Sequence, residues 1–150
     1  MTSPHIDSAH ARDRILPGQE LPPYGVVLTL QRLVMEAGAN RDFAPIHFDP
    51  DAARESGAAN VYANTTFIET LLEALIRSWA GLSARIRILE FSMLAFNCAG
   101  DSIQAGGAVT ATSEQGADEF TVDLDLWVEG PRGRTVSGAA TVAFPRPAVS

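Results

Sequence analysis

The chain has 150 residues, of which 46% are hydrophobic and 19% are charged, a composition typical of one globular domain. A formal net charge of -7 at pH 7 argues against a nucleic-acid partner, because proteins that bind phosphate backbones usually carry a basic face. The sequence has no apolar run long enough for a membrane span or a secretory signal, no cluster of His and Cys that predicts a metal site, and one cysteine, which together favour a cytoplasmic protein.

The first part of the chain has no clear periodicity. Residues 1–20 are predicted to form a flexible arm, which leaves residues 21–150 as a single domain. Residues 26–37 are ambiguous, because the letters VVLTL suit a strand, whereas the residues after them suit a helix that stops at Gly38.

Two helices are predicted next. Asp49 followed by Pro50 marks the start of a short helix, since Asp caps free N–H groups and Pro suits the first helical position. Asn64 or Thr65 caps a longer helix that ends at Gly81. Apolar residues recur along this helix at spacings of three and four: Phe67, Leu71, Leu72, Leu75, Ile76 and Trp79.

After the long helix the hydrophobic period changes to two, which indicates strands. In the first of them, Arg85 and Arg87 are expected on one face, with Ile86 and Ile88 on the other. Hairpin turns are predicted at EQGAD and EGPRG. Three or four antiparallel strands are expected, over residues 84–96, 101–113, 118–130 and 134–144. The pattern predicts the α+β class, with a strongly curved antiparallel sheet wrapped around the long helix.

The stretch RDFAPIHFDP carries the residues with the most chemistry. Pro45 keeps Asp42 to His47 out of a helix, so that a stiff bend can aim both side chains at one cavity. A carboxylate and an imidazole together can deprotonate a water and return a proton to a neighbouring atom. The helix start at Asn64 and Thr65 can polarise the carbonyl group that such a reaction needs. The alternative is structural: Asp42 caps a turn and His47 is solvated.

The same stretch, with the helix after it, resembles the MaoC-like or (R)-specific enoyl-CoA hydratase family. The motif of that family is Gly-Asp-x-Asn-Pro-Ile/Leu-His, followed by x-Asp and a helix of small residues. The matching positions here are Asp42, Pro45, Ile46, His47, Asp49 and Ala53. The resemblance covers roughly residues 25 to 145.

The resemblance implies a hot-dog fold and dimers whose sheets pair edge to edge, as a homodimer or with a second hot-dog subunit. It also implies hydration of trans-2-enoyl-CoA thioesters or dehydration of (R)-3-hydroxyacyl-CoA. Asp42 and His47 would be the catalytic dyad, and the helix start at Asn64 and Thr65 would hold the thioester oxygen. No cofactor is implied, since coenzyme A enters as part of the substrate.

Two residues depart from the family motif. Arg41 stands in place of its Gly, and Ala44 in place of its Asn. The letters RDF before the His, the Asn at the helix entry and WAG at the helix end are closer to small MaoC-like subunits of steroid side-chain degradation. This likeness implies a bulky acyl group, for which Ala44, Tyr62 and Phe67 are the candidate pocket residues.

Two other functions fit the same residues. The first is a hot-dog lyase or isomerase that acts on a non-CoA biosynthetic molecule, since the sequence has no evident Lys and Arg cluster for CoA phosphates. The second is a partner subunit that shapes the site of another hot-dog chain in a heteromeric hydratase.

Overall fold

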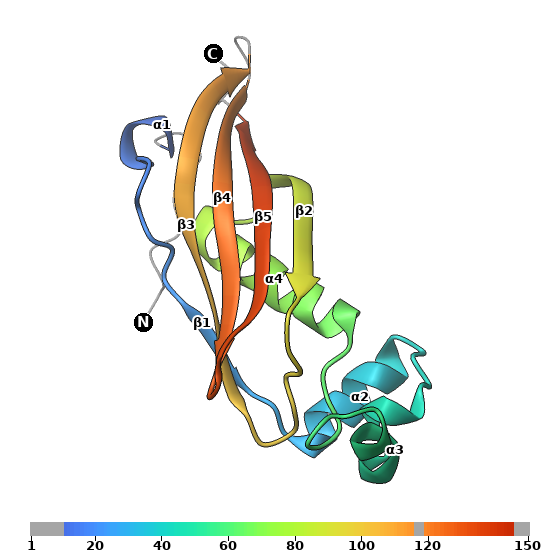
Figure 1. Cartoon of the computed structure of the whole chain (residues 1–150). Helices are drawn as coiled ribbons and strands as arrows, with labels where there is room; N and C mark the ends of the chain where they lie inside the picture. Colours follow the sequence, from blue (N-terminus) through green and yellow to red (C-terminus); the bar gives the residue numbers. More distant parts are fainter. Residues whose placement is uncertain (1–10, 116–118, 146–150) are drawn as a thin grey trace.

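The computed structural model describes residues 11–115 and 119–145 of the chain. They form one antiparallel sheet, a long helix across one face of it, and several smaller helices, two of which lie near the start of the long helix (Figure 1). The helices and strands are α1 (Ala11–Arg14), β1 (Tyr24–Val27), α2 (Leu30–Ala39), the 3-10 helix η2 (Pro45–His47), α3 (Pro50–Glu55), α4 (Thr65–Ala80), β2 (Arg85–Met93), β3 (Ser102–Gln115), β4 (Glu119–Gly130) and β5 (Gly133–Pro145).

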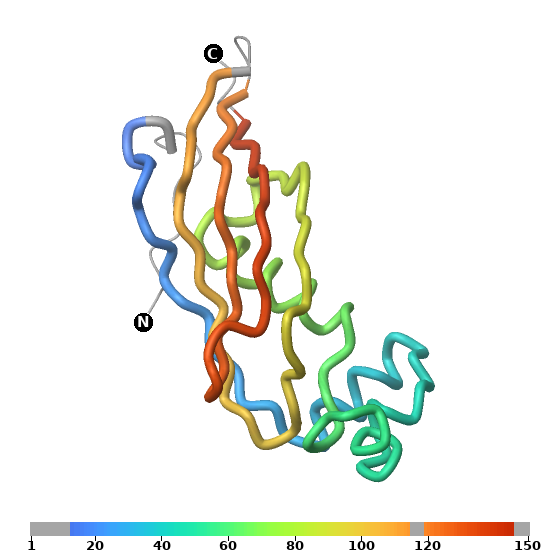
Figure 2. The backbone as a smooth tube through the Cα atoms, in the orientation of Figure 1, coloured from blue at the N-terminus to red at the C-terminus, as the bar shows by residue number. Residues whose placement is uncertain are grey.

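The five strands of the sheet have the order β1-β3-β4-β5-β2, and all neighbours are antiparallel. The sequence predicts three or four strands, and the additional one is β1, in the stretch that is ambiguous between strand and helix. Both structures occur there, since β1 ends at Val27 and α2 begins at Leu30. The backbone trace shows the long strands bowed beside α4 (Figure 2).

The long helix is the core element that the sequence predicts. Asn64 caps α4 by accepting the N–H of Phe67 at 2.9 Å, and Gly81 ends the helix with φ 79°. Its buried residues are Ile68, Leu71, Leu72, Leu75, Ile76, Trp79 and Ala80. Each large apolar side chain buried in this way contributes about 1.5–3 kcal/mol. Among the described residues, no helix is long and apolar enough to cross a membrane.

Strand β2 departs from the predicted alternation. A β-bulge between Ile86 and Ile88 inserts an extra residue, so that the phase of the strand shifts. Ile88 is 52% exposed, although the predicted alternation places it on the same face as Ile86, which packs against the core. Leu89 packs against the core instead. The prediction for Ile88 is therefore wrong, because periodicity alone does not reveal a bulge.

The segment before β1 runs alongside strand β3 of the sheet. Residues 1–10 of the predicted flexible arm lie outside the described residues. Further along, Ile15 is 2% exposed and belongs to the core, and the Leu21 N–H donates to the Gly107 carbonyl at 2.8 Å. The last residues of the predicted arm are therefore part of the domain.

The two predicted hairpin turns join β3 to β4 and β4 to β5. In the second turn Gly130 pairs with Gly133, which has φ 103°, and this turn is confirmed. The first turn includes residues 116–118, which lie outside the described residues.

Candidate active site

A turn at the end of α2 fixes the backbone of Asp42. The Asp42 N–H donates to the Ala37 carbonyl at 2.9 Å, and the Arg41 N–H donates to the Gly38 carbonyl at 3.2 Å. These two bonds define a Schellman motif, in which the residue after the helix cap is left-handed. That residue is Arg41, with φ 57°. The family motif has Gly at this position, and the structure gives the reason, since Gly adopts this conformation without steric cost.

Pro45 directs the chain from Asp42 to His47. Ala44 is extended, with φ -64° and ψ 125°, as the residue before a proline should be. Pro45 then begins the 3-10 turn η2, where the His47 N–H donates to the Ala44 carbonyl at 3.1 Å. Asp49 caps α3 directly afterwards, because its side chain accepts two N–H groups of the first turn. The stretch is therefore both a turn with a helix cap and a means of bringing an acid and a histidine together.

The carboxylate of Asp42 and the imidazole of His47 face each other. His47 Nε2 lies 3.3 Å from Asp42 Oδ2. On the other side of the ring, Nδ1 lies 2.8 Å from the Tyr62 carbonyl oxygen, which can only accept, so the neutral ring carries its proton on Nδ1. Nε2 is then an acceptor, like the carboxylate. Two neighbouring acceptors suit a water molecule that donates one hydrogen to each.

The side chain of Asn64 ties the start of α4 to Asp42. Its Nδ2 donates to Asp42 Oδ2 at 2.9 Å, while its Oδ1 caps the helix. The Ala44 N–H donates to the other carboxylate oxygen at 3.3 Å. The hydrogen bond from Asn64 lowers the pKa of Asp42 below its ordinary value, although burial acts in the opposite direction. The sequence predicts that the helix start at Asn64 and Thr65 binds a substrate carbonyl, and the structure adds that the amide of the Asn64 side chain holds the carboxylate of Asp42.

The first turn of α4 offers backbone donors beside this pair. The side chain and the carbonyl of Asn64 accept the N–H groups of the third and fourth helical residues. The N–H groups of Thr65 and Thr66 are therefore the first-turn donors left for a ligand, at the positive end of the helix dipole. The Thr65 hydroxyl itself lies 3.7 Å from the sulfur of Met93. A carbonyl bound here would be held by the backbone and not by the side chain of Asn64.

The three predicted pocket residues do not share one wall. The Tyr62 ring stands edge-on to the His47 ring, with centroids 5.4 Å apart, and contacts Phe96 on its other side. Ala44 contacts the carboxylate through its backbone N–H. Of the three, only Phe67 lines the cavity described next.

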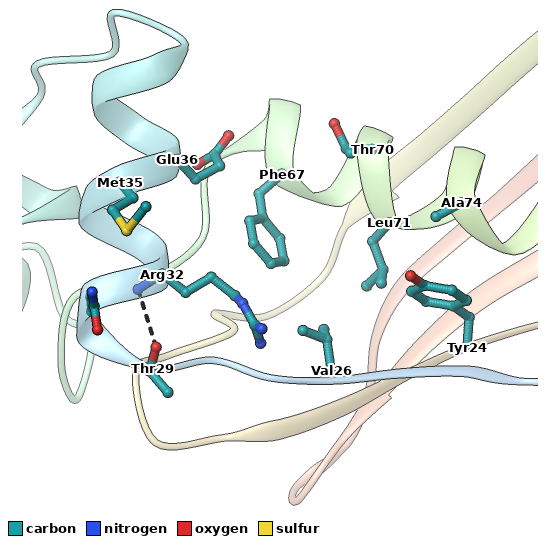
Figure 3. A pocket seen from close by; sticks show the side chains of 11 residues that line it. Tyr24, Val26, Thr29, Arg32, Met35, Glu36, Phe67, Thr70, Leu71 and Ala74 are labelled. Atoms are coloured by element: carbon teal, nitrogen blue, oxygen red, sulfur yellow. Dashed lines mark hydrogen bonds between the residues drawn. The ribbon is translucent and has the colours of Figure 1, made fainter.

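A cavity of about 690 Å³ lies between β1, α2 and α4. Figure 3 shows the Arg32 side chain reaching from α2 across the cavity toward Val26, with Phe67 and Leu71 on α4 facing it. The apolar lining consists of Tyr24, Val26, Met35, Phe67, Leu71 and Ala74. A largely apolar cavity with a few polar groups is the usual form of a small-molecule site.

Glu36 adds a second carboxylate to this region. Burial raises the pKa of Glu36, and the Asn40 side chain that donates to it acts in the opposite direction. The charges of His47 and Asp42 also act on this pKa, the first lowering it and the second raising it. The sequence pattern does not distinguish Glu36 or Arg32 as site residues, because both lie in the stretch that is ambiguous between strand and helix. Their spacing of four is the signal that would place them on one helix face.

Comparison with known proteins gives one curated relative. No family model matches the sequence. The chain is 30% identical over 82 residues to the beta subunit of 3-oxo-4,17-pregnadiene-20-carboxyl-CoA hydratase from Mycobacterium tuberculosis. This match spans 55% of the chain and 64% of the subunit, so it covers less than two thirds of the relative's length.

Solved structures match most of the chain. The ChsH1–ChsH2 complex from Mycobacterium tuberculosis contains a chain with a TM-score of 0.78 and 24% identity, over 86% of this chain and 98% of that one. The R-hydratase PhaJ1 from Pseudomonas aeruginosa, in its unliganded form, has a TM-score of 0.79 and 18% identity, over 90% and 85% of the two chains. At these identities the likeness shows a shared fold.

This fold is the hot-dog fold, an antiparallel sheet curved around a long helix, as the sequence predicts. The predicted resemblance is likewise confirmed, since the relatives include a subunit of a pregnadiene-carboxyl-CoA hydratase, an R-hydratase and a MaoC-like dehydratase from Rhodospirillum rubrum. The fold and the site thus define a hot-dog protein with a carboxylate–imidazole pair at the start of its central helix.

Proposed function

We propose that the protein is a hydratase or dehydratase that adds water to a 2-enoyl thioester or removes it from a 3-hydroxyacyl thioester. The observation that carries this proposal is the contact of 3.3 Å between Asp42 Oδ2 and His47 Nε2, beside free N–H groups at the start of α4. The names of the relatives support it, since both the curated relative and PhaJ1 are hydratases.

In the proposed reaction, Asp42 and His47 bind one water through its two hydrogens. The water oxygen forms a bond with C3 of the enoyl group while one of its protons passes to the pair. The electrons of the double bond move toward the thioester carbonyl, and the pair then returns a proton to C2. The atoms of one water are thereby added across the double bond. Dehydration follows the same steps in reverse.

The negative charge that develops on the thioester oxygen needs donors that are already in place. The backbone N–H groups of Thr65 and Thr66 have this role in the proposal. The hydrogen bond between Asn64 and Asp42 supports it, since it brings the carboxylate to the same helix end. No cofactor takes part, and coenzyme A is present only as the carrier of the acyl group.

A bulky acyl group, such as a steroid-like one, is the proposed substrate class. The name of the curated relative contains a pregnadiene carboxyl-CoA. The cavity of about 690 Å³ supports the same class, because its lining is mostly apolar. The lining includes Phe67, which is three residues after Asn64 on α4 and therefore close to the proposed site of the thioester. The small side chain of Ala44 leaves further space beside the Asp42 carboxylate.

A second hot-dog subunit is the proposed partner. Strand β2 is at the edge of the sheet, and an edge strand leaves backbone N–H and C=O groups ready to pair. Ile88, Met93, Leu94 and Phe96 are exposed on this strand and just after it. Phe96 contacts Tyr62, so this surface reaches the site. The relatives support a heteromer, since one is a beta subunit and another is a complex of two named proteins.

Replacement of Asp42 by Asn tests the proposal. The loss of the base should lower kcat/KM for a trans-2-enoyl-CoA about 10²–10⁴-fold. The fold should be retained, because Asn fits the same volume. Asp51→Asn is the matched control, since Asp51 is an exposed acid on α3 that pairs with Arg54. Full activity of the Asp42→Asn protein would remove the pair from the mechanism.

A further inference from the structure

Two opposite charges on one face of α2 line the cavity. Arg32 and Glu36 are four residues apart, one helical turn, and both contribute to the cavity wall together with apolar residues of β1 and α4 (Figure 3). An Arg and a Glu at this spacing usually pair with each other on a helix surface. Here each has another partner.

Arg32 donates through Nη1 to the Val27 carbonyl at the start of the helix. Glu36 accepts from the Asn40 side chain, one turn further along. Among the ion pairs of the described residues, none joins Arg32 to Glu36. A guanidinium has five N–H groups, so Arg32 keeps donors for a ligand while it is anchored at Val27.

The two charges lie at different depths along the cavity. Figure 3 shows the Glu36 side chain at the end of the cavity where α4 begins, and Asn64 at that helix start holds Asp42. The guanidinium of Arg32 lies further along, between Phe67 and Val26 (Figure 3). An acyl group that starts at Asp42 and runs over Phe67 therefore passes Glu36 before it reaches Arg32.

The balance of charge decides which ligand group suits Arg32. The cavity lining contains one guanidinium, that of Arg32, and one carboxylate, that of Glu36. Glu36 would repel a carboxylate on the acyl group and so offset the attraction of that carboxylate to Arg32. A neutral oxygen accepts a hydrogen bond from Arg32 without this repulsion, and its apolar surroundings strengthen that bond.

We propose that the acyl group that this cavity accepts carries a neutral oxygen, as a keto or hydroxyl group, and that Arg32 binds this oxygen. Glu36 disfavours an acyl group with a carboxylate at the same place. The inference rests on the proposed function, because it places the thioester end at Asp42 and His47. Arg32 is in this account a residue that determines specificity and not a catalytic one.

Binding measurements test this inference separately from turnover. Calorimetry would compare three series of saturated acyl-CoA thioesters of increasing length: unsubstituted, with a keto group near the far end, and with a carboxylate there. Hydration does not consume saturated thioesters. At one chain length the keto series should bind about tenfold more tightly than the unsubstituted one, and the carboxylate series should not.

Three variants make the result specific. Arg32→Met keeps the length of the side chain but has no donor, so the keto preference should disappear. Arg54→Met is the matched control, an exposed arginine that pairs with Asp51 on α3, and should keep the preference. Glu36→Gln retains an acceptor for Asn40, and should improve binding of the carboxylate series relative to the keto series. This variant also tests the inference if Arg32→Met fails to fold.

The outcomes separate the two proposals. Hydration of enoyl-CoA without any keto preference, or with a preference that survives in Arg32→Met, overturns the role of Arg32 and leaves the proposed function. A keto preference that depends on Arg32 in a protein with no hydratase activity supports this inference and overturns the proposed reaction. Failure of all three series to bind overturns both.

Discussion

The amide of Asn64 donates to Oδ2 of Asp42 at 2.9 Å, although the two residues are 22 positions apart in the chain. The same side chain caps α4 through its oxygen. The carboxylate is therefore positioned by the helix that forms the core of the domain. One residue both caps that helix and lowers the pKa of the proposed base.

Replacement of Asn64 by Ser should separate these two roles. Ser retains an oxygen that caps the helix but has no amide for Asp42. The pKa of Asp42 should then rise toward its ordinary value of 3.8, because the hydrogen bond that lowers it is lost. Since the proposed base acts as a carboxylate, the acid limb of the pH profile of kcat/KM should move to higher pH. An acid limb at the same pH in both proteins would show that Asn64 does not control the base.

Asn64→Ala is the companion variant, since it removes the cap as well as the amide. It should show the same shift of the acid limb and lose about 1 kcal/mol of unfolding free energy, measured by chemical denaturation. The lowered pKa of Asp42 stabilises the fold above pH 3.8, and this contribution is lost as the pH falls through the pKa of the folded protein. The unfolding free energy of both variants should therefore vary less with pH across this acidic range.

Arg41→Gly should stabilise the protein. Arg41 has φ 57°, a conformation that costs a side-chain residue about 1–2 kcal/mol. Gly avoids that cost but loses more chain entropy on folding, so the expected gain is roughly 0.5–1 kcal/mol. Arg54→Gly, in the helical backbone of α3, is the control and should lower the stability. A loss of stability in Arg41→Gly would mean that the arginine side chain makes a contribution larger than this backbone cost.

Leu72→Ala should be among the more costly changes in the core. Leu72 is 0% exposed on α4, and truncation of a buried leucine leaves a cavity that costs about 2–5 kcal/mol. Leu82→Ala makes the same chemical change at a residue that is 89% exposed, and should change the unfolding free energy by less than about 0.5 kcal/mol. Denaturation midpoints of the two variants give the comparison. Similar values would contradict the packing of α4 against the sheet.

Gly138→Ala should disturb the contact between β5 and β2. A Cβ at this position would lie 2.5 Å from the Glu90 carbonyl oxygen, which is backbone and cannot swing away. A loss of about 1–3 kcal/mol is expected in thermal or chemical unfolding. Gly25→Ala in β1 is the matched control, since a Cβ there would lie 3.8 Å from the Ile103 carbonyl oxygen, an ordinary contact. Equal losses in the two variants would show that the effect comes from β-strand propensity and not from the close approach.

Local signals in the sequence predicted the parts of the fold that depend on neighbouring residues. The cap at Asn64, the apolar spacing after it and the stop at Gly81 predicted α4, and the structure confirms its bounds. The exposed position of Ile88 was not predicted, because a bulge depends on how β2 pairs with β5. The end of α2 lies beyond Gly38 for a related reason: the left-handed residue after the helix is Arg41, which is not a usual stop signal.

In the candidate site, too, the local features were predicted from the sequence and the contacts between distant elements were not. Pro45 between Asp42 and His47 predicted a bend that brings the two side chains to one place, and they lie 3.3 Å apart. The partner of Asp42 was not predicted, since the bond to Asn64 spans the chain between two elements. Arg32 was not predicted either, because its role depends on the cavity that α2 forms with β1 and α4.

The group that fixes the tautomer of His47 is the backbone carbonyl of Tyr62. Every amino acid has this carbonyl, so a point mutation at position 62 changes the ring above the histidine without removing the acceptor at Nδ1. The backbone at this position is itself held by the bridge between Tyr62 and Cys98. The side of the imidazole that carries the proton is thus robust to mutation at position 62, because the acceptor that sets it belongs to the backbone.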